Sequence, residues 1–224
     1  METLMLKTVK EKRIASEILN EPNAFFIIKA ITAMLNEEQE QRINFYNAIT
    51  EQEKVEFING EIVVHSPAKL QHNRAMLLLA QLLNIYSIEH DLGFVGAEKM
   101  MITLTRNDYE PDICYFKPEK ADLFKEHQIL FPAPDLIIEV ISPSTECRDR
   151  GIKFKDYEAH QVEEYWIADP ENQTIEQYHL VGEEYSLVLN SSQGFIESFV
   201  VEGFKIPIAA IFNKAENVKA MRNI

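Results

Sequence analysis

The fold of this chain is organised around the stretch Pro134-Asp135-Leu136-Ile137-Ile138-Glu139-Val140-Ile141-Ser142-Pro143. An apolar run of this length, rich in Val and Ile, predicts a central strand that is buried on both faces. Glu139 interrupts the run, and an unpaired charge buried away from water costs several kcal/mol. We therefore expect the Glu139 carboxylate to have a cation as its partner.

Composition limits the classes of protein to which the chain can belong. A length of 224 residues and a hydrophobic fraction of 46% are sufficient for one domain with a substantial core. The 36 acidic residues outnumber the 22 basic ones, which gives a net charge of −14. This balance argues against a generally basic surface that holds nucleic acid, so a DNA-handling role requires a local basic patch or a divalent metal.

The sequence favours a cytoplasmic protein that does not span a membrane. Its N-terminus lacks the features of a signal peptide, and no stretch approaches the roughly 18 consecutive apolar residues of a membrane span. The two cysteines, Cys114 and Cys147, form no CxxC pair and are too few for a disulfide framework. We interpret them as plain thiols in a reducing compartment.

The chain before the central strand changes from helical to extended patterns. Residues 1–35 have partly helical spacing of apolar side chains with a break near Pro22, and residues 37–50 predict a further, polar helix. From Val55 the apolar period changes to two, and Asn59-Gly60 predicts a type I′ hairpin, since both turn positions need positive φ. The remaining elements expected before residue 134 are a helix over 68–90 and strands over 94–104 and 111–116.

After the central strand, the pattern predicts one more helix and several strands. These are a helix over 148–160, a strand over 164–170, and an antiparallel meander of short runs over 175–180, 185–189 and 195–200. The order of elements implies an α/β (α+β) fold with a mixed central sheet and helices on its faces. Since no repeat or linker is visible, we expect an N-terminal helical appendage over 1–36 and a single domain over 37–224.

Two aspartates could pair with Glu139 in a metal site, and strand geometry distinguishes them. Asp135 lies on the same strand face, but four residues at about 3.3 Å each separate the two Cα atoms by roughly 13 Å, too far to share one ion. Asp112 lies instead at the start of a different strand. If the two strands are neighbours, a spacing of about 4.8 Å lets Asp112 and Glu139 share Mg²⁺ or Mn²⁺. Asp135 is then interpreted as structural.

Four motifs in a fixed order identify a family resemblance. They are Pro111-Asp112, Glu139-Val140-Ile141, Asp149-Arg150-Gly151-Ile152-Lys153-Phe154-Lys155-Asp156-Tyr157 and Glu164-Tyr165-Trp166-Ile167-Ala168-Asp169-Pro170. Together they resemble the Uma-two family of restriction-endonuclease-like proteins, within the PD-(D/E)XK nuclease superfamily. The resemblance extends from about residue 37 to Phe212, which leaves the N-terminal appendage outside it.

The resemblance implies a restriction-endonuclease-like fold and a metal-dependent endonuclease that hydrolyses DNA. It implies that Asp112 and Glu139 bind the metal, with the Val140 carbonyl as a third ligand. The superfamily places a lysine two residues after the acid, where this chain has Ile141. The usual substitute in the family is a lysine of the following helix, and the matching residue here is Lys153.

Helix geometry is compatible with a catalytic Lys153. Arg150, Lys153 and Tyr157 share one face of an α-helix at i, i+3 and i+7 spacing. Lys155 lies about 200° around the helix from Lys153, so it points in another direction. Only one of the two lysines is therefore expected to reach the site.

Further residues and partners follow with less support from the sequence. Glu61, beside the hairpin turn, and His72, in the first turns of the long helix, are weaker candidates for supporting the metal ligands. A homodimer is expected from the superfamily and from the apolar appendage. A local groove for DNA would have to use basic residues such as Arg74, Lys99, Arg106, Arg148 and Arg150.

Two other classes of function are alternatives. One is a nuclease-like fold with weak or no catalysis that serves as a protein-interaction module, its acidic surface binding a basic partner. The other is a Ser or Cys hydrolase. It is disfavoured because Ser142 and Ser144 lie in no nucleophile-elbow context, and no His accompanies either cysteine in a recognisable motif.

Overall fold

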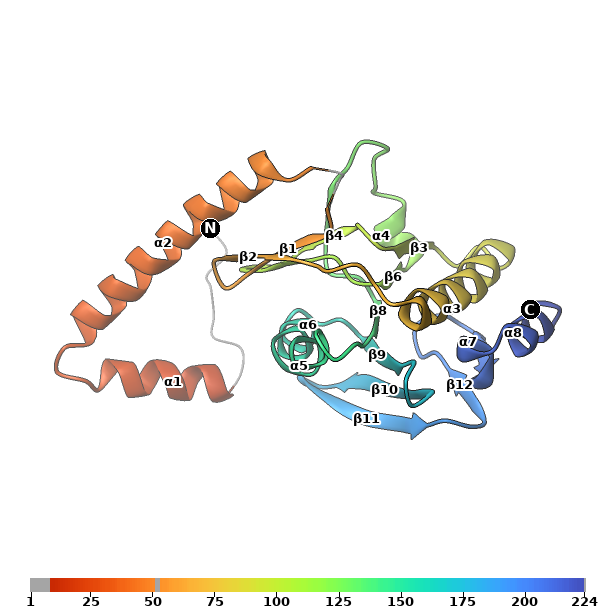
Figure 1. The fold of residues 1–224 in the computed structure, drawn as a ribbon. Coiled ribbons are helices and arrows are strands. Elements are labelled where there is room, and N and C mark those ends of the chain that lie inside the picture. The colour runs from red at the N-terminus through yellow and green to blue at the C-terminus, as the bar shows by residue number, and fades with distance from the viewer. Residues whose placement is uncertain (1–8, 51–52, 224) are drawn as a thin grey trace.

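The computed structural model describes residues 9–50 and 53–223, which form an α+β fold (Figure 1). The helices are α1 (Val9–Leu19), α2 (Ala24–Ala48), α3 (Leu70–Glu89), α4 (Pro118–Ala121), α5 (Glu146–Arg148), the π-helical segment η1 (Asp149–Lys153), α6 (Phe154–Ala159), α7 (Ala209–Phe212) and α8 (Lys214–Met221). The strands are β1 (Val55–Ile58), β2 (Glu61–Val64), β3 (Phe94–Ala97), β4 (Met101–Thr103), β5 (Asp108–Tyr109), β6 (Ile113–Phe116), β7 (Leu130–Phe131), β8 (Leu136–Val140), β9 (Glu164–Asp169), β10 (Thr174–Val181), β11 (Glu184–Ser191), β12 (Phe195–Glu197) and β13 (Lys205–Pro207).

The central sheet has the strand order β11-β10-β9-β8-β6-β3. Strand β8 pairs with β9 in parallel and with β6 in antiparallel orientation, so the predicted mixed sheet is confirmed. A second sheet has the order β2-β1-β5-β4-β7. Because β5 in this sheet is followed almost at once by β6 in the central sheet, the short connection through Asp112 lies where the two sheets meet.

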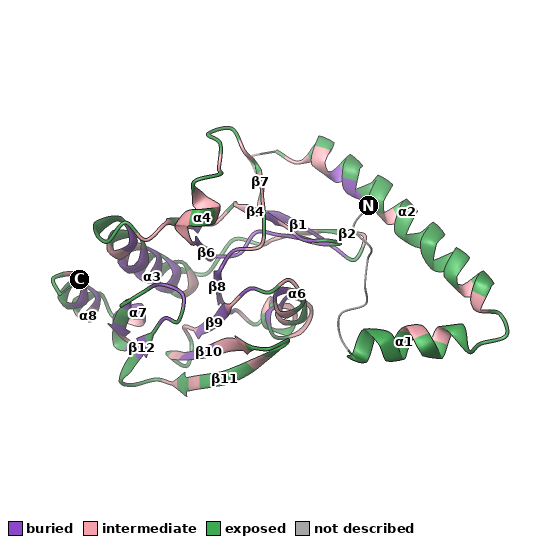
Figure 2. Ribbon diagram, turned by 180° about the vertical axis from the view of Figure 1, so that it is seen from behind, coloured by how far each residue is buried: buried purple, intermediate pink, exposed green. Residues whose placement is uncertain are grey.

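Strand β8 is the predicted central strand, and each of its residues is buried (Figure 2). Its side chains alternate between two apolar cores. Leu136, Ile138 and Val140 pack in the core with α3, α7 and α8. Ile137 and Ile141 pack in the core on the other side, with the aromatic residues of α6 and β9. Since alternate residues of a strand share a face, Glu139 points to the same side as Ile137 and Ile141.

The β1–β2 hairpin forms as predicted. Ile58 pairs with Glu61 across the turn, where Asn59 and Gly60 have φ angles of 51° and 85°. Positive φ at both turn positions is the type I′ conformation, whose twist matches that of the flanking strands. Strand β1 is buried along its whole length, and one of its residues is the acidic Glu56.

Several predicted elements differ from the structure because local backbone geometry interrupts a continuous pattern. The strand predicted over 94–104 is divided into β3 and β4, which belong to different sheets, and Glu98 between them has a positive φ of 58°. The helix predicted over 148–160 consists of α5, η1 and α6 in succession. The last run of the predicted meander, β12, leaves the central sheet and pairs with β13.

The N-terminal helices α1 and α2 project from the body of the molecule (Figure 1). Helix α2 continues without a break from Ala24 to Ala48, so it crosses the predicted boundary at residues 36 and 37. Residues 1–8 of the predicted N-terminal helix lie outside the described residues. Arg42 attaches α2 to the body through hydrogen bonds of 2.6 and 2.7 Å to the Asp108 carboxylate. No helix in the described parts of the chain is long and apolar enough to cross a membrane.

Candidate active site

A cavity of about 740 Å³ lies beside the C-terminal end of β8 and the start of β1. Its lining includes Lys54 and five residues predicted from the sequence: His72, Asp112, Glu139, Val140 and Lys153. These residues come from segments far apart in the sequence, and the fold brings them together. The cavity is therefore the place at which the sequence-predicted residues meet.

Asp112, directly before β6, lies beside Glu139 of the neighbouring strand β8. Strand β6 pairs with β8 in a register that sets Ile113 opposite Ile138. The Val140 N–H donates a hydrogen bond of 2.9 Å to Asp112 Oδ2, and the Asp112 N–H lies 3.4 Å from Glu139 Oε2. Each carboxylate therefore accepts a hydrogen bond from a backbone N–H of the neighbouring segment.

The cation expected beside Glu139 is Lys153. Its Nζ lies 3.0 Å from Glu139 Oε1, which also accepts a hydrogen bond of 2.9 Å from the Tyr157 hydroxyl. Lys155 is exposed, so one of the two lysines reaches the site, as helix geometry predicted. Lys153 also contacts Glu56 Oε1 at 2.8 Å and Asp149 Oδ1 at 3.5 Å.

The Asp112 carboxylate has a different set of partners. Lys54 Nζ lies 2.8 Å from Oδ1, and His72 Nε2 lies 3.2 Å from Oδ2. Lys54 immediately precedes β1, and His72 is on the first turn of α3. Asp112 and Glu139 are therefore adjacent, but each contacts a different lysine.

The two carboxylates have pKa values that move in opposite directions. Burial raises the pKa of Glu139 to about 8, with the Lys153 charge opposing this rise and the nearby anions Asp149 and Asp112 adding to it. Burial also acts to raise the pKa of Asp112, but the hydrogen bonds and charges of His72 and Lys54 outweigh it and hold this pKa well below the usual range. The two carboxylates therefore differ in how readily they ionise.

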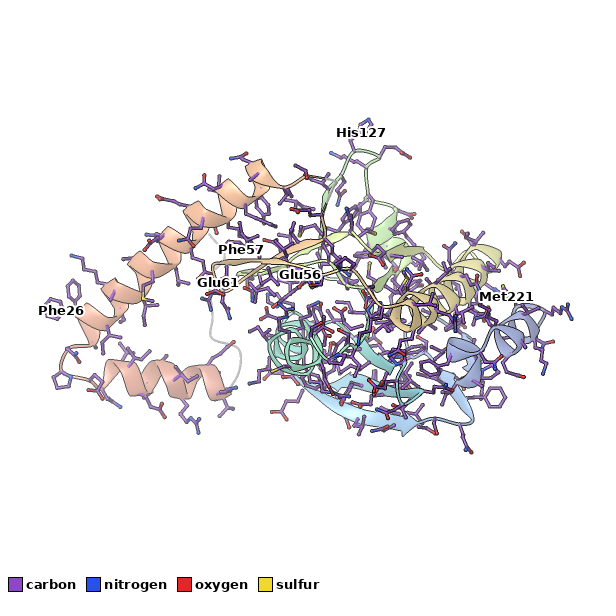
Figure 3. All side chains as sticks on the ribbon, in the orientation of Figure 1. Phe26, Glu56, Phe57, Glu61, His127 and Met221 are labelled. Carbon is purple, nitrogen blue, oxygen red and sulfur yellow. The ribbon has the colours of Figure 1, made fainter. Side chains whose placement is uncertain are left out.

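Glu61 is a sequence-based candidate for supporting the metal ligands, but the acidic residue of the hairpin that contacts the site, through Lys153, is Glu56. Glu61 is exposed beside the turn and does not line the cavity, and Figure 3 shows it at the end of the hairpin away from Glu56. Glu56 is fully buried and contacts Lys153 and, at 2.9 Å, His65 Nε2. Both Glu56 and Glu139 interrupt apolar runs, so the same signal could have found Glu56. His72 contacts Asp112 directly.

The predicted helix face also needs correction. Arg150 does not join Lys153 and Tyr157 but makes two hydrogen bonds, of 2.6 and 2.8 Å, to the Glu176 carboxylate. The reason is that η1 is π-helical, and its wider turn changes which residues share a face. Arg106, a residue expected to line a groove for DNA, instead pairs with Glu38 and does not line the cavity. Arg148 is the member of that predicted set that lines the cavity.

The chain is similar to a family of known proteins. The model of the Uma2 family, described as "Putative restriction endonuclease", matches residues 38–209. The chain belongs to the Uma2 family. The match covers β1, β6, β8 and η1, so the candidate site residues Asp112, Glu139 and Lys153 lie inside it. Helix α1 and most of α2 precede it.

Relatives of this Uma2 chain include two uncharacterized proteins of Synechocystis sp., sll1609 and slr1290. The first is 30% identical over 139 residues, which cover 61% of this chain and 77% of the relative. The second is 30% identical over 146 residues, which cover 62% and 73%. A crystal structure described as a "putative nuclease belonging to DUF820", from Anabaena variabilis, superposes with a TM-score of 0.65 and 18% identity, covering 75% of this chain and 94% of the other. This structural similarity supports the fold.

Proposed function

We propose that this protein is a metal-dependent endonuclease that hydrolyses DNA phosphodiester bonds. The observation that carries the proposal is the closeness of Asp112, directly before β6, to Glu139 on the neighbouring strand β8, at the edge of a cavity that lysine side chains also line. Carboxylates in this arrangement are suited to a hard divalent cation, and the cation is suited to a phosphate. Membership of the Uma2 family gives independent support.

The residues of the site fit Mg²⁺ or Mn²⁺. Among the described residues, no group of three or more His, Cys, Asp and Glu side chains is arranged to hold an ion. Mg²⁺, however, usually binds through one or two carboxylates and keeps several waters. We propose the carboxylates of Asp112 and Glu139 and the carbonyl of Val140 as its ligands. A bound cation would favour the ionised form of Glu139 and so oppose the rise in its pKa.

The chain's own residues would divide the work of hydrolysis. When bound, the metal would supply Lewis acidity toward a water and a phosphate oxygen. His72 and the Val140 N–H hold the Asp112 carboxylate in place. Tyr157 and Lys153 do the same for Glu139. In this arrangement Lys153, the lysine proposed as catalytic from the family resemblance, acts on the reaction through the position and charge of Glu139.

The main alternative is an interaction module without catalysis. The observation that favours it is the set of contacts around Asp112, in which Lys54, His72 and the Val140 N–H already satisfy the carboxylate. The net charge of −14 would suit a basic protein partner.

We also propose that the protein is a cytoplasmic homodimer. Cys114 and Cys147 are free thiols, which suits a reducing compartment, and α1 and α2 expose apolar side chains that a second copy could cover.

A metal titration tests the site. Mg²⁺ or Mn²⁺ is expected to raise the melting temperature of the wild-type protein, and Asp112→Asn is expected to abolish this shift. The matched control is Asp135→Asn, because Asp135 lies just before β8 but accepts from the Lys117 N–H and Lys120 Nζ, away from the cavity. A metal shift that survives in Asp112→Asn, or is lost equally in the control, would remove the site assignment.

A nuclease assay separates the enzyme from the interaction module. Single-stranded, duplex and branched DNA are incubated with Mg²⁺ and either the wild type, Glu139→Gln or Asp135→Asn. We expect cleavage of at least one DNA form by the wild type and the control, and a loss of at least about 10²-fold in Glu139→Gln. Wild-type protein that binds metal but cleaves none of the three DNA forms would favour the module.

A further inference from the structure

The two lysines beside the carboxylates have very different surroundings. Lys153 is 3% exposed, and its ammonium contacts three carboxylates, those of Glu56, Glu139 and Asp149. An ammonium has three N–H donors, so these acceptors use its full capacity. Contact with a substrate phosphate would require Lys153 to leave a buried acidic environment. Its geometry is that of an internal counter-ion.

Lys54 faces the same site from the open side. Its side chain is 19% exposed and lines the cavity, and among the described residues its ammonium contacts one carboxylate, that of Asp112, at 2.8 Å. A lysine ammonium with a single acceptor has donors left for a further anion. Lys54 therefore combines direct contact with a proposed metal ligand and access to the space that a substrate would enter.

The fold fixes Lys54 in this position. The Lys54 carbonyl accepts a hydrogen bond of 3.0 Å from the His65 N–H, which extends the ladder of the β1–β2 hairpin by one step. Because side chains two residues apart share a strand face, Lys54 and Glu56 point to the same side. Glu56 contacts Lys153, so the hairpin supplies both a buried anion and a cavity-facing cation.

We propose that Lys54, rather than Lys153, is the lysine of this site that contacts the phosphodiester. This inference rests on the proposed function. The superfamily's lysine position is occupied by Ile141, which is 5% exposed and packs in an apolar core. Lys54 reaches the Asp112 side of the carboxylate pair from another strand and supplies the positive charge that Ile141 lacks. Lys153 keeps the part of holding Glu139.

Other basic side chains near the cavity are less suited to contact the phosphodiester. His65 is paired with Glu56, and His72 holds Asp112 from α3. Lys69 also lines the cavity, but it is exposed where α3 begins and has no place in the carboxylate network. Lys69 is therefore the matched control for Lys54, since it is a lysine of the same cavity that lacks contact with the metal ligands.

The test compares Lys54→Met, Lys54→Arg and Lys69→Met with the wild type. The first readout is the single-turnover cleavage rate in Mg²⁺, on whichever DNA form the wild type cleaves best. We expect Lys54→Met to lose about 10²-fold or more, the scale for removing one electrostatic contact to a reacting group. Lys54→Arg should restore part of this loss, and Lys69→Met should stay within about threefold of the wild type.

The second readout is DNA affinity in Ca²⁺ at several salt concentrations. Loss of one phosphate contact should reduce the salt slope of duplex binding by about 0.9, and Lys54→Arg should keep the wild-type slope. The third readout is the Mg²⁺ thermal shift, which Lys54→Met should retain, because Asp112 loses a competing cation. If Lys54→Met fails to fold, it will lose the Mg²⁺ thermal shift. In that case the cleavage rate and the salt slope of DNA binding of Lys54→Arg test the proposal.

The outcomes distinguish this inference from the proposed function. If the wild type and Lys54→Met cleave DNA at the same rate and bind it with the same salt slope, the role of Lys54 is overturned. The proposed nuclease function would still stand. A Lys69→Met variant with the defects of Lys54→Met also overturns it, since the effect would then be one of general charge. A wild type that neither binds nor cleaves any of the DNA forms overturns both proposals.

Discussion

At the scale of single residues, Lys153 explains how a carboxylate can be tolerated inside the central strand. Its charge lies among Glu56, Glu139 and Asp149, so its removal would leave buried acids without a counter-ion. We expect Lys153→Met to lower the free energy of unfolding at pH 7 by about 3–5 kcal/mol, because the buried acidic residues around it would lose their shared counter-ion. Lys155→Met, at an exposed position two residues away, should change it by less than about 0.5 kcal/mol.

Urea unfolding of the two lysine variants measures this difference. The methionine side chain has a similar length in both cases, so any general effect of removing a lysine is common to both. Equal unfolding free energies for Lys153→Met and Lys155→Met would contradict the counter-ion role. They would also reopen the assignment of Lys153 as a residue that is free to meet the substrate.

The residues of the site differ in how visible they are in the sequence. Glu139 could be predicted because a charge in an apolar run requires an explanation, and Asp112 because the strand spacing excludes Asp135. Lys54 could not be predicted, since a lysine just before a strand is ordinarily solvated. Its importance depends on the approach of the hairpin to the central sheet. This is a contact between distant segments, and local periodicity carries no record of it.

At the scale of elements, the π-helical segment η1 joins the site to strand β10 of the central sheet. Arg150 in η1 makes its two hydrogen bonds to Glu176 on β10 and a third, of 2.9 Å, to Glu146. The side chains are 34% and 12% exposed for Arg150 and Glu176, so solvent screens part of the attraction. We expect Arg150→Met to cost about 1 kcal/mol of unfolding free energy at pH 7.

The contribution of this ion pair should depend on pH in a defined direction. Burial acts to raise the pKa of Glu176, but the hydrogen bonds from Arg150 and Tyr178 outweigh it and lower the pKa below the ordinary 4.5. A lowered pKa stabilises the folded protein above the unfolded-state value, and this stabilisation is lost as the pH falls through the folded-state value. The deficit of Arg150→Met should therefore be constant from pH 7 to 5 and shrink below about pH 4.

Urea unfolding at pH 7, 5 and 3.5 tests this dependence. Arg13→Met is the control, because the Arg13–Glu17 pair on α1 is 71% and 67% exposed and should contribute little at any pH. An Arg150→Met deficit that stays constant to pH 3.5 would show that the arginine stabilises the protein by packing rather than through Glu176.

Most of the elements could be predicted from the sequence, and the exceptions share a cause. The hairpin, β8 and β9 formed as expected because each has a strong local signal, an Asn-Gly turn or a continuous apolar run. The division of 94–104 depends on a positive φ at Glu98, a residue type that gives no warning of it. The π-helical turn of η1 is also set by tertiary contacts, since Asp149 and Lys153 are both buried at the site.

At the scale of the whole molecule, the distribution of charge reconciles an acidic chain with a proposed DNA substrate. The net charge of −14 opposes non-specific binding over the surface. The cavity, however, is lined by cationic side chains that include Lys54 and Arg148. Affinity would then depend on this local patch and on the metal, as the sequence required. If the protein binds DNA in this way, so few phosphate contacts should give a shallow salt dependence.

The projecting helices α1 and α2 leave apolar surface that one chain does not cover. Phe25 and Phe26 are 72% and 70% exposed, and Figure 3 shows Phe26 at the far end of α2 from the body. Burying each ring in a homodimer would contribute about 1.5–3 kcal/mol. We expect the wild type to sediment at twice the 25.9 kDa of one chain, and the double variant Phe25→Ser with Phe26→Ser to raise the dissociation constant at least about 10²-fold.

A control variant that replaces similarly exposed apolar side chains elsewhere on the surface makes the dimer prediction specific to α2. Leu123 and Ile129, in the segment after α4, are 76% and 64% exposed, and their double substitution by serine should leave the dissociation constant unchanged. Sedimentation equilibrium over a range of protein concentrations measures all three proteins. A wild type that stays monomeric at high concentration would contradict the dimer. A control as weakened as the α2 variant would instead indicate general hydrophobic association, because the two substitutions would then differ only in position.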